Sequence, residues 1–310
     1  MKVPVCPAVC PLCGPDFPKQ AIAHGRDFEY ATTDDQEFSF VRCMNCNCVL
    51  LDPRPVDDVI GSLYPAHYEP YRFAQLPLLV RKGRDFVQRA KVSAVKRYAP
   101  AGARIVDVGC GAGALLRLLR EHGDPSWQLC GWDYPGAHLE RLTRDGFDII
   151  AGPIDAEHAP TNVDLFVLNQ VIEHFAHPDR ILSLLARSLR NGGHIVLETP
   201  NIDGLDARWF RARHWGGYHI PRHMVLFDTR SLGALVQRHG FALVETKNLA
   251  SPAFWVQSLH HAAVESKLAP LAGLCNLRNL PLVAAFSLCD LARSPFAATS
   301  NQRLVARKLA

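Results

Sequence analysis

The stretch that decides the fold runs from Ile105 to Gly113 and reads IVDVGCGAG. Its first half, IVDV, holds three β-branched apolar residues around one aspartate, which is typical of a buried strand that ends at a site. Its second half alternates glycine with small residues and leads into a helical pattern at 114–121. Glycine lets the backbone pass close beneath a ligand, where a side chain would collide with it. The stretch therefore predicts a strand, a ligand-binding turn and a helix.

The segments around this turn continue the alternation of strand and helix patterns. Strands are predicted at 104–108, 129–134, 148–151, 163–168, 194–199, 242–247 and 303–306. Helices should follow the first five strands, and another should run from Ser231 to His239. The alternation predicts an α/β fold with a Rossmann-like, mostly parallel sheet of seven strands and helices on both faces.

A carboxylate follows the glycine turn at the sequence spacing that is typical of a ribose-binding residue. Asp133 closes the second predicted strand 20 residues after Gly113, where it can accept both hydroxyls of an adenosine ribose. A dinucleotide dehydrogenase is the competing interpretation, since Gly109 and Gly111 fit the looser G-x-G-x-x-A pattern. Against it stand the third glycine at position 113, the acidic Asp107 and the lack of a Tyr-x-x-x-Lys pair in the sequence.

The motif VDVGCGAG resembles the glycine motif of the class I S-adenosylmethionine-dependent methyltransferases. The resemblance extends over about 104–309, roughly two-thirds of the chain. It implies S-adenosylmethionine as methyl donor, and it implies that the segment Val171–His174 follows the fourth strand at the donor pocket. The donor-site residues that it implies are Asp107, Gly109, Cys110, Gly111 and Gly113 around the methionine part, Asp133 and Tyr134 at the ribose, Ile154 and Asp155 beside the adenine, and Asn169 and Gln170 along the pocket.

The main task of the protein in methyl transfer is to position the two substrates. The sulfonium already makes the methyl group electrophilic, so the enzyme must align acceptor, methyl carbon and sulfur. An acceptor hydroxyl or acidic C–H group also needs a general base.

Six of the ten cysteines fall within the first 48 residues and include two C-x-x-C knuckles separated by 29 residues. Such knuckles can aim four thiolates at one Zn²⁺ ion in a closed tetrahedral site, which is structural because no coordination position stays open. The predicted ligands are Cys10, Cys13, Cys43 and Cys46, with Cys6 and Cys48 as substitutes. We therefore expect a zinc-ribbon-like module at 1–52, a helical linker or cap at 53–100, and the methyltransferase domain at 101–310. The Pro-rich stretch 52–55 is expected to act as a linker after the cysteine module.

A zinc ribbon followed by a tyrosine-rich segment also looks like the arrangement in sugar C-methyltransferases of natural-product pathways. In that family a tyrosine of this segment helps to close the donor site. The resemblance implies the same role for Tyr68 or Tyr71, with core packing as the alternative.

The acceptor side is expected in an insertion at 202–230, which follows the fifth strand at the ligand-binding edge of the sheet. His219 or His223 is the predicted general base, because the pKa of imidazole lies near neutrality. Pro221 argues against a continuous helix and a metal-binding histidine pair, and predicts that the two rings point in different directions. Glu173 and His174 are next in line as base. Four arginines could bind a phosphate or carboxylate, or be solvated: Arg208, Arg211, Arg213 and Arg222.

A second insertion at 249–298 contains two apolar runs, 268–277 and 279–289, each too short to span a bilayer. We expect a helical cap or a homodimer surface there, with an apolar lid over the acceptor as the alternative. The net charge of +4 does not demand a nucleic acid or an anionic membrane as partner. No signal-peptide pattern or apolar run of membrane-spanning length is present in the sequence, so a cytoplasmic location is expected.

These observations predict methyl transfer to the oxygen or carbon of a small molecule, such as a sugar, a polyketide or another secondary metabolite. The first rival is an RNA methyltransferase that uses the zinc module for recognition, although the sequence lacks the Asn/Asp-Pro-Pro-Tyr/Phe motif of base-amine methylation after the fourth strand. The second is a non-catalytic donor-binding protein, against which the intact donor motif argues.

Overall fold

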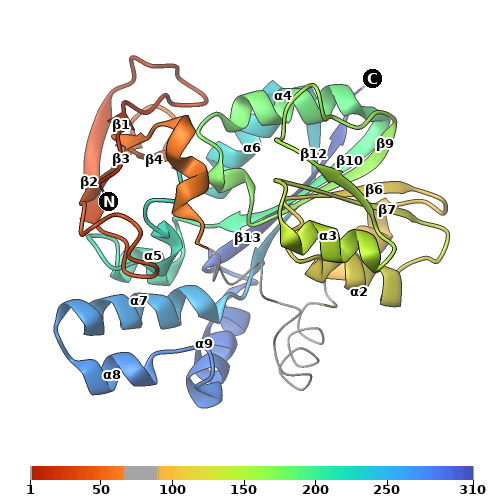
Figure 1. Ribbon diagram of the computed structural model, residues 1–310. Coiled ribbons are helices and arrows are strands. Elements are labelled where there is room, and N and C mark those ends of the chain that lie inside the picture. The colour runs from red at the N-terminus through yellow and green to blue at the C-terminus, as the bar shows by residue number, and fades with distance from the viewer. Residues whose placement is uncertain (1, 66–88, 90, 310) are drawn as a thin grey trace.

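A seven-stranded sheet forms the centre of the molecule in the computed structural model, which describes residues 2–65, 89 and 91–309 (Figure 1). Its strands are β6 (Arg104–Val108), β7 (Gln128–Asp133), β8 (Asp148–Ala151), β9 (Val163–Asn169), β10 (Leu189–Pro200), β12 (Phe241–Leu249) and β13 (Asn301–Lys308). The order is β12-β13-β10-β9-β6-β7-β8. The strands from β10 to β8 run parallel, and β13 is antiparallel to both of its neighbours. The predicted α/β fold with a seven-stranded Rossmann-like sheet is confirmed.

Helices cover both faces of this sheet (Figure 1). They are α2 (Ala114–His122), α3 (Ala137–Arg144), α4 (Pro178–Ser188) and α6 (Thr229–Arg238), together with a helix at 91–98. The short helix α5 (Leu205–Trp209) lies away from the sheet, beside the N-terminal strands (Figure 1). The helix predicted after the third strand is wrong, because residues 152–162 form turns. Pro153 and Pro160 cannot donate backbone hydrogen bonds there, and the side chain of Asp155 accepts from the backbone of Glu157 and His158 in place of a helical carbonyl.

Alternation along the strands separates two apolar layers. One face buries Ile105, Val167, Val196 and Val305 against α2 and the helix at 91–98. The opposite face packs into a larger core that extends to α4, α6 and the N-terminal residues. Because side chains alternate, the first face also carries the polar residues that follow these apolar ones at the carboxyl ends of the strands.

The N-terminal residues form a small sheet that is completed by a strand from far along the chain. Its order is β11-β4-β3-β2, with β2 (Lys19–Gly25), β3 (Phe38–Cys43), β4 (Val49–Leu51) and β11 (Val225–Leu226). A second pair joins β1 (Val5–Cys6) to β5 (Arg54–Pro55), and a 3₁₀ helix, η1 (Asp57–Leu63), follows. The stretch 52–55 is thus not the linker we expected, since Arg54 and Pro55 are buried in a strand pair.

The insertion after β12 folds into three helices, α7 (Pro252–Glu265), α8 (Ala269–Leu274) and α9 (Leu280–Arg293). They form a separate layer next to α5 and the N-terminal sheet (Figure 1). α7 contacts the short helix η4 (Gly216–Tyr218), which belongs to the predicted acceptor side. Among the described residues, no helix is both long and apolar enough to cross a membrane.

Candidate functional site

The glycine turn lies between β6 and α2, and two of its glycines are required by both conformation and packing. Gly109 and Gly113 have φ angles of +68° and +74°. A Cβ atom would lie 2.6 Å from Val171 at Gly109, and 2.3 Å from Leu142 at Gly113. Between them the side chain of Cys110 is buried in the apolar cluster beside α2 and α3. Cys110 therefore contributes only its backbone to the surface of the turn.

Asp133 fixes the turn from the neighbouring strand. Its Oδ2 atom accepts a hydrogen bond from the backbone of Gly111 at 2.7 Å, and Oδ1 accepts one from Tyr134 at 2.7 Å. Burial raises the pKa of Asp133, and the two backbone donors oppose this shift. The carboxylate stands at the end of β7, beside the turn, as the sequence predicted for a ribose-binding residue. Tyr134 is exposed next to it.

A charged network lies beside the turn at the carboxyl ends of β6, β9 and β10. Burial raises the pKa of Asp107 to about 8, while the charge of Lys91 acts in the opposite direction. Lys91 Nζ donates to Asn169 Oδ1 at 2.7 Å and lies 3.3 Å from Glu198 Oε2. Glu198 Oε1 accepts from Arg303 Nε at 2.8 Å. Sequence reasoning missed Lys91, Glu198 and Arg303, because no motif marks residues that meet only across the sheet.

The remaining predicted donor-site residues follow the strand ends. Ile154 is buried, and Asp155 Oδ1 lies 2.8 Å from His158 Nδ1, a hydrogen bond that lowers the pKa of Asp155. Gln170 takes a left-handed conformation and donates from Nε2 to Asn301 at 3.1 Å. Tyr68 and Tyr71 lie outside the described residues.

Three histidines meet where β9 and the 202–230 insertion come together. The ring centroids of His174 and His223 are 4.6 Å apart, those of His219 and His223 4.9 Å, and those of His174 and His219 6.0 Å. The expectation that His219 and His223 point in different directions is wrong. The chain folds back between them, with His219 at a φ angle of +40° and a hydrogen bond from Arg222 N to His219 O at 2.8 Å.

His219 is held by a carboxylate of the N-terminal module. Its Nδ1 atom lies 2.8 Å from both carboxylate oxygens of Glu29, in the loop between β2 and β3. Burial by itself raises the pKa of Glu29, but the charge and hydrogen bond of His219 outweigh it and lower that pKa. Glu29 therefore stays ionised and accepts from Nδ1, which leaves the lone pair of the neutral His219 ring on Nε2. A carboxylate that orients an imidazole in this way is typical of general bases.

Two of the four predicted arginines and two aromatic residues of the insertion stabilise the fold. Arg222 is fully buried and pairs with Asp27 of the same N-terminal loop, at 2.7 Å. Arg213 pairs with two carboxylates, Glu37 and Glu265. Trp215 and Tyr218 are also buried and pack in the core. Arg208 and Arg211 remain exposed.

The segment that follows β9 supplies two more groups to the histidine cluster from the short helix η3 (Ile172–His174). Glu173 is fully buried, and burial raises its pKa to about 8. Burial and the charge of His219 lower the pKa of His174 to about 3, so this ring is neutral. The Tyr64 hydroxyl, directly after η1, lies 2.9 Å from His174 Nδ1. Tyr64, which precedes Tyr68 and Tyr71 in the sequence, thus contacts the histidine cluster.

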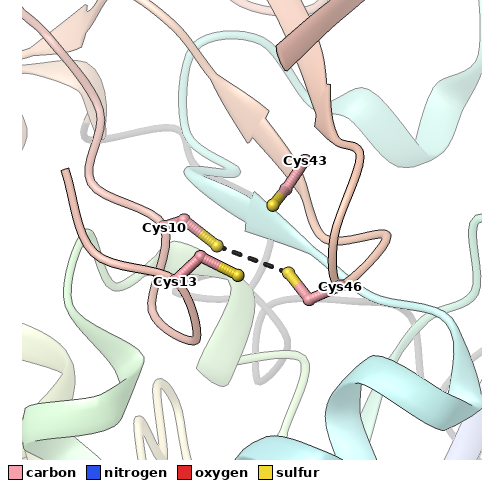
Figure 2. Close-up of side chains that lie close together, drawn as sticks. All are labelled: Cys10, Cys13, Cys43 and Cys46. Atoms are coloured by element: carbon pink, nitrogen blue, oxygen red, sulfur yellow. Dashed lines mark hydrogen bonds between the residues drawn. The ribbon is translucent and has the colours of Figure 1, made fainter. Parts of the chain in front are cut away.

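The four predicted zinc ligands come together, as Figure 2 shows. The sulfur atoms of Cys10, Cys13, Cys43 and Cys46 all lie within 4.8 Å of one another. Each knuckle closes through a left-handed residue after its second cysteine, Gly14 or Asn47. Zn–S bonds of about 2.3 Å in a tetrahedron fit such spacings. The thiols therefore fit one structural zinc ion, which would tie the end of β3 to the N-terminal strand region.

Comparison with known proteins gives one family match. A model described as "Methyltransferase domain" matches residues 81–246, just over half of the chain. The ubiquinone biosynthesis O-methyltransferase of Stutzerimonas stutzeri is 28% identical over 109 residues, which are 33% of this chain and 46% of that protein. The related enzyme of Idiomarina loihiensis is 29% identical over 108 residues, 32% of this chain and 43% of that protein. The chain thus spans less than half the length of these relatives.

Solved structures agree on the fold. Phosphoethanolamine N-methyltransferase 2 of Haemonchus contortus, in complex with S-adenosyl-L-methionine, superposes with a TM-score of 0.52 at 17% identity, over 94% of this chain and 69% of that one. A complex of the Haloferax volcanii Trm112 methyltransferase activator with a methyltransferase gives 0.50 at 16% identity, over 78% of this chain and 97% of that one.

Proposed function

Because this chain belongs to the methyltransferase-domain family, we propose that it transfers the methyl group of S-adenosylmethionine to an oxygen or acidic carbon of a small molecule. One observation carries the proposal: the glycine turn and the histidine cluster adjoin. Val171, which a Cβ at Gly109 would touch, lies two residues before Glu173 in the same short loop. A donor in the turn would therefore present its methyl group beside groups that can take a proton.

The donor residues have complementary tasks in this proposal. The Asp133 carboxylate would accept from the ribose hydroxyls at the end of β7. The ammonium of the methionine part would bring a positive charge to the buried Asp107, whose ionisation burial opposes. Glu198 is paired with both Lys91 and Arg303. These three charged side chains would therefore keep their positions when the donor binds.

The proposed base is His219, with Glu29 as the residue that orients it. As the acceptor oxygen forms its bond to the methyl carbon, the carbon–sulfur bond breaks and the sulfur becomes a neutral thioether. His219 Nε2 takes the proton that the acceptor loses, and the neighbouring carboxylate stabilises the imidazolium. His174, by contrast, has a strongly lowered pKa and binds protons poorly.

The acceptor class follows from the same chemistry. A base beside the donor is needed for a hydroxyl or an acidic C–H group, and it is not needed for a neutral amine. The ubiquinone-biosynthesis relatives are O-methyltransferases by name, which supports a hydroxylated small molecule here as well. We place this acceptor among sugars, polyketides and other secondary metabolites.

Calorimetry tests the donor half of the proposal. The purified chain should bind S-adenosylmethionine or S-adenosylhomocysteine, and Asp133→Ala should weaken binding about 10-fold or more, because a charged hydrogen bond contributes about 1.5–3 kcal/mol. Asp145→Ala, an exposed carboxylate paired with Arg117, is the matched control and should bind normally. Preference for a nicotinamide cofactor, or unchanged affinity of a folded Asp133→Ala protein, would contradict the proposal.

A further inference from the structure

One buried carboxylate oxygen at the site, Oε1 of Glu173, lacks a hydrogen-bond partner among the described residues. Glu173 Oε2 accepts from the Thr199 hydroxyl at 3.0 Å, but Oε1 makes no hydrogen bond within the described part of the chain. Oε1 lies 3.9 Å from His223 Nε2, which is too long for a hydrogen bond. A buried carboxylate normally has a cation or a set of donors around it. The arrangement is therefore incomplete as it stands.

Two imidazoles beside Glu173 have backbone carbonyl oxygens near Nδ1. His223 Nδ1 lies 2.8 Å from the Gly217 carbonyl oxygen, and His174 Nδ1 lies 3.2 Å from the Arg222 carbonyl oxygen and 2.9 Å from the Tyr64 hydroxyl. A carbonyl oxygen only accepts, so Nδ1 of His223 carries the proton and its Nε2 keeps the lone pair. A bound metal would select the same tautomer in His174, in which Nδ1 donates to the Arg222 carbonyl and the Tyr64 oxygen. Histidines that bind metals usually donate their second ring nitrogen in this way.

The three groups converge on one small volume. Ligand atoms of Glu173, His174 and His223 all lie within 4.8 Å of one another. A single ion can bridge such distances with bonds of about 2.0–2.2 Å. We propose that Glu173, His174 and His223 bind a divalent metal ion, separate from the zinc of the cysteine site.

The chemistry of this second site differs from that of the first. Four thiolates close the coordination of a structural zinc ion, whereas two imidazoles and one carboxylate leave positions open. An open position beside the donor pocket would take an oxygen of the acceptor. The metal would then orient the acceptor hydroxyl and favour loss of its proton to His219, whose ring lies 4.9 Å from that of His223. This role rests on the proposed function, but metal binding itself does not.

Manganese offers a selective probe, because Mn²⁺ prefers oxygen and nitrogen ligands and leaves a four-cysteine zinc site untouched. The full chain, purified with its zinc, is titrated with Mn²⁺ while electron paramagnetic resonance follows the free ion. We expect one Mn²⁺ per chain, and at least a 10-fold loss of affinity in Glu173→Gln and in His223→Ala. The matched control is His239→Ala, a half-buried histidine at the end of α6, which should bind Mn²⁺ like the wild type.

A second measurement covers the case in which the variants fail to fold. Co²⁺ added to the zinc-loaded wild type should give the weak visible bands of an imidazole–carboxylate site without an intense thiolate charge-transfer band. No Mn²⁺ binding by the wild type, a thiolate band with Co²⁺, or unchanged binding by folded Glu173→Gln and His223→Ala proteins would overturn the site. Donor binding without Mn²⁺ binding would reject the metal and leave the proposed function standing, and Mn²⁺ binding without donor binding would do the reverse.

Discussion

Two carboxylates of the N-terminal loop 26–37 decide how the acceptor-side loop is held. Glu29 orients His219, and Asp27 neutralises the buried guanidinium of Arg222 three residues further on. Both contacts join residues at least 190 positions apart in the sequence. Such pairs leave no local pattern, so sequence reasoning found the histidines and missed the carboxylates that position them.

The proposed base gives a direct kinetic prediction. His219→Ala should lower kcat by roughly 10²–10⁴-fold with an identified acceptor, because proton removal typically contributes that much. Glu29→Gln should give a smaller loss in the same direction, since the amide no longer stabilises the imidazolium. Glu37→Gln, an exposed carboxylate of the same loop that pairs with Arg213, is the matched control.

Donor affinity is measured in parallel by calorimetry and should stay within about 2-fold of the wild type in all three variants, because none touches the glycine turn. Wild-type turnover in both His219→Ala and Glu29→Gln would place the base elsewhere.

The Asp27–Arg222 pair should make stability depend on acid. Burial raises the pKa of Asp27, but the hydrogen bonds and charge of Arg222 outweigh it and lower that pKa from 3.8 to about 2. A carboxyl whose pKa is lower in the folded state stabilises the fold above its unfolded pKa and loses that contribution as the pH falls through the folded one. The pair should therefore contribute about 2 kcal/mol at neutral pH that disappears between about pH 4 and pH 2.

Urea unfolding at several pH values tests this. Asp27→Asn should lower the free energy of unfolding at pH 7 by about 3–5 kcal/mol, because it leaves Arg222 buried without a counter-charge. It should also flatten the acid dependence between pH 4 and 2. The exposed Asp35, which pairs with Arg26, serves as control through Asp35→Asn. An acid dependence identical to the wild type would show that Asp27 is not the group that titrates.

At the scale of elements, the sequence predicted the strands that carry a local apolar pattern, but it did not predict which distant segments pair with each other. The glycine turn and the strand patterns around it were sufficient for all seven strands, because each buried strand carries its own apolar run. The conformation of two proline-containing stretches was predicted wrongly. Arg54–Pro55 forms a strand with Val5–Cys6, and residues 152–162 form turns in place of a helix. In both, the partners that decide the conformation lie outside the local pattern.

The two cysteine knuckles lead to a prediction about metal content. The purified chain should hold one zinc ion per molecule at the cysteine site, and Cys43→Ser should lose this zinc and lower the melting temperature, because Cys43 ends β3 and anchors the hairpin that carries Glu29. Elemental analysis and thermal unfolding measure the two effects. Cys289→Ser, on α9 and remote from the knuckles, should change neither. Full zinc content in a folded Cys43→Ser protein would reject the assigned ligands.

At the scale of the whole molecule, α8 and α9 leave an apolar surface uncovered. Leu271, Leu274, Leu280, Leu288 and Leu291 are all exposed, and α8 buries none of its residues. So many exposed leucines on two short helices indicate an interaction surface. We expect a second copy of the chain to cover it.

Light scattering coupled to gel filtration checks the dimer. The wild type should elute as a dimer, and Leu280→Glu with Leu288→Glu should make it a monomer, since two charges would be buried in the interface. Leu309→Glu changes an exposed leucine elsewhere and should leave the dimer intact. A monomeric wild type that binds apolar acceptors more weakly after the double substitution would identify the surface as a lid instead.

The pairing of β4 with β11 has a consequence for how the protein is made. Val49 and Leu50 leave the ribosome early, but their strand partners Leu226 and Val225 are synthesised some 175 residues later. His219 and Arg222, the partners of Glu29 and Asp27, are synthesised 190 and 195 residues after them. Both cysteine knuckles are synthesised early and could bind zinc before the rest of the chain is made. The metal would then stabilise the β2–β3 hairpin until β11 is synthesised and pairs with β4. The N-terminal module at 1–52 should therefore not fold as an independent unit. Its folding is completed only when most of the chain has been translated.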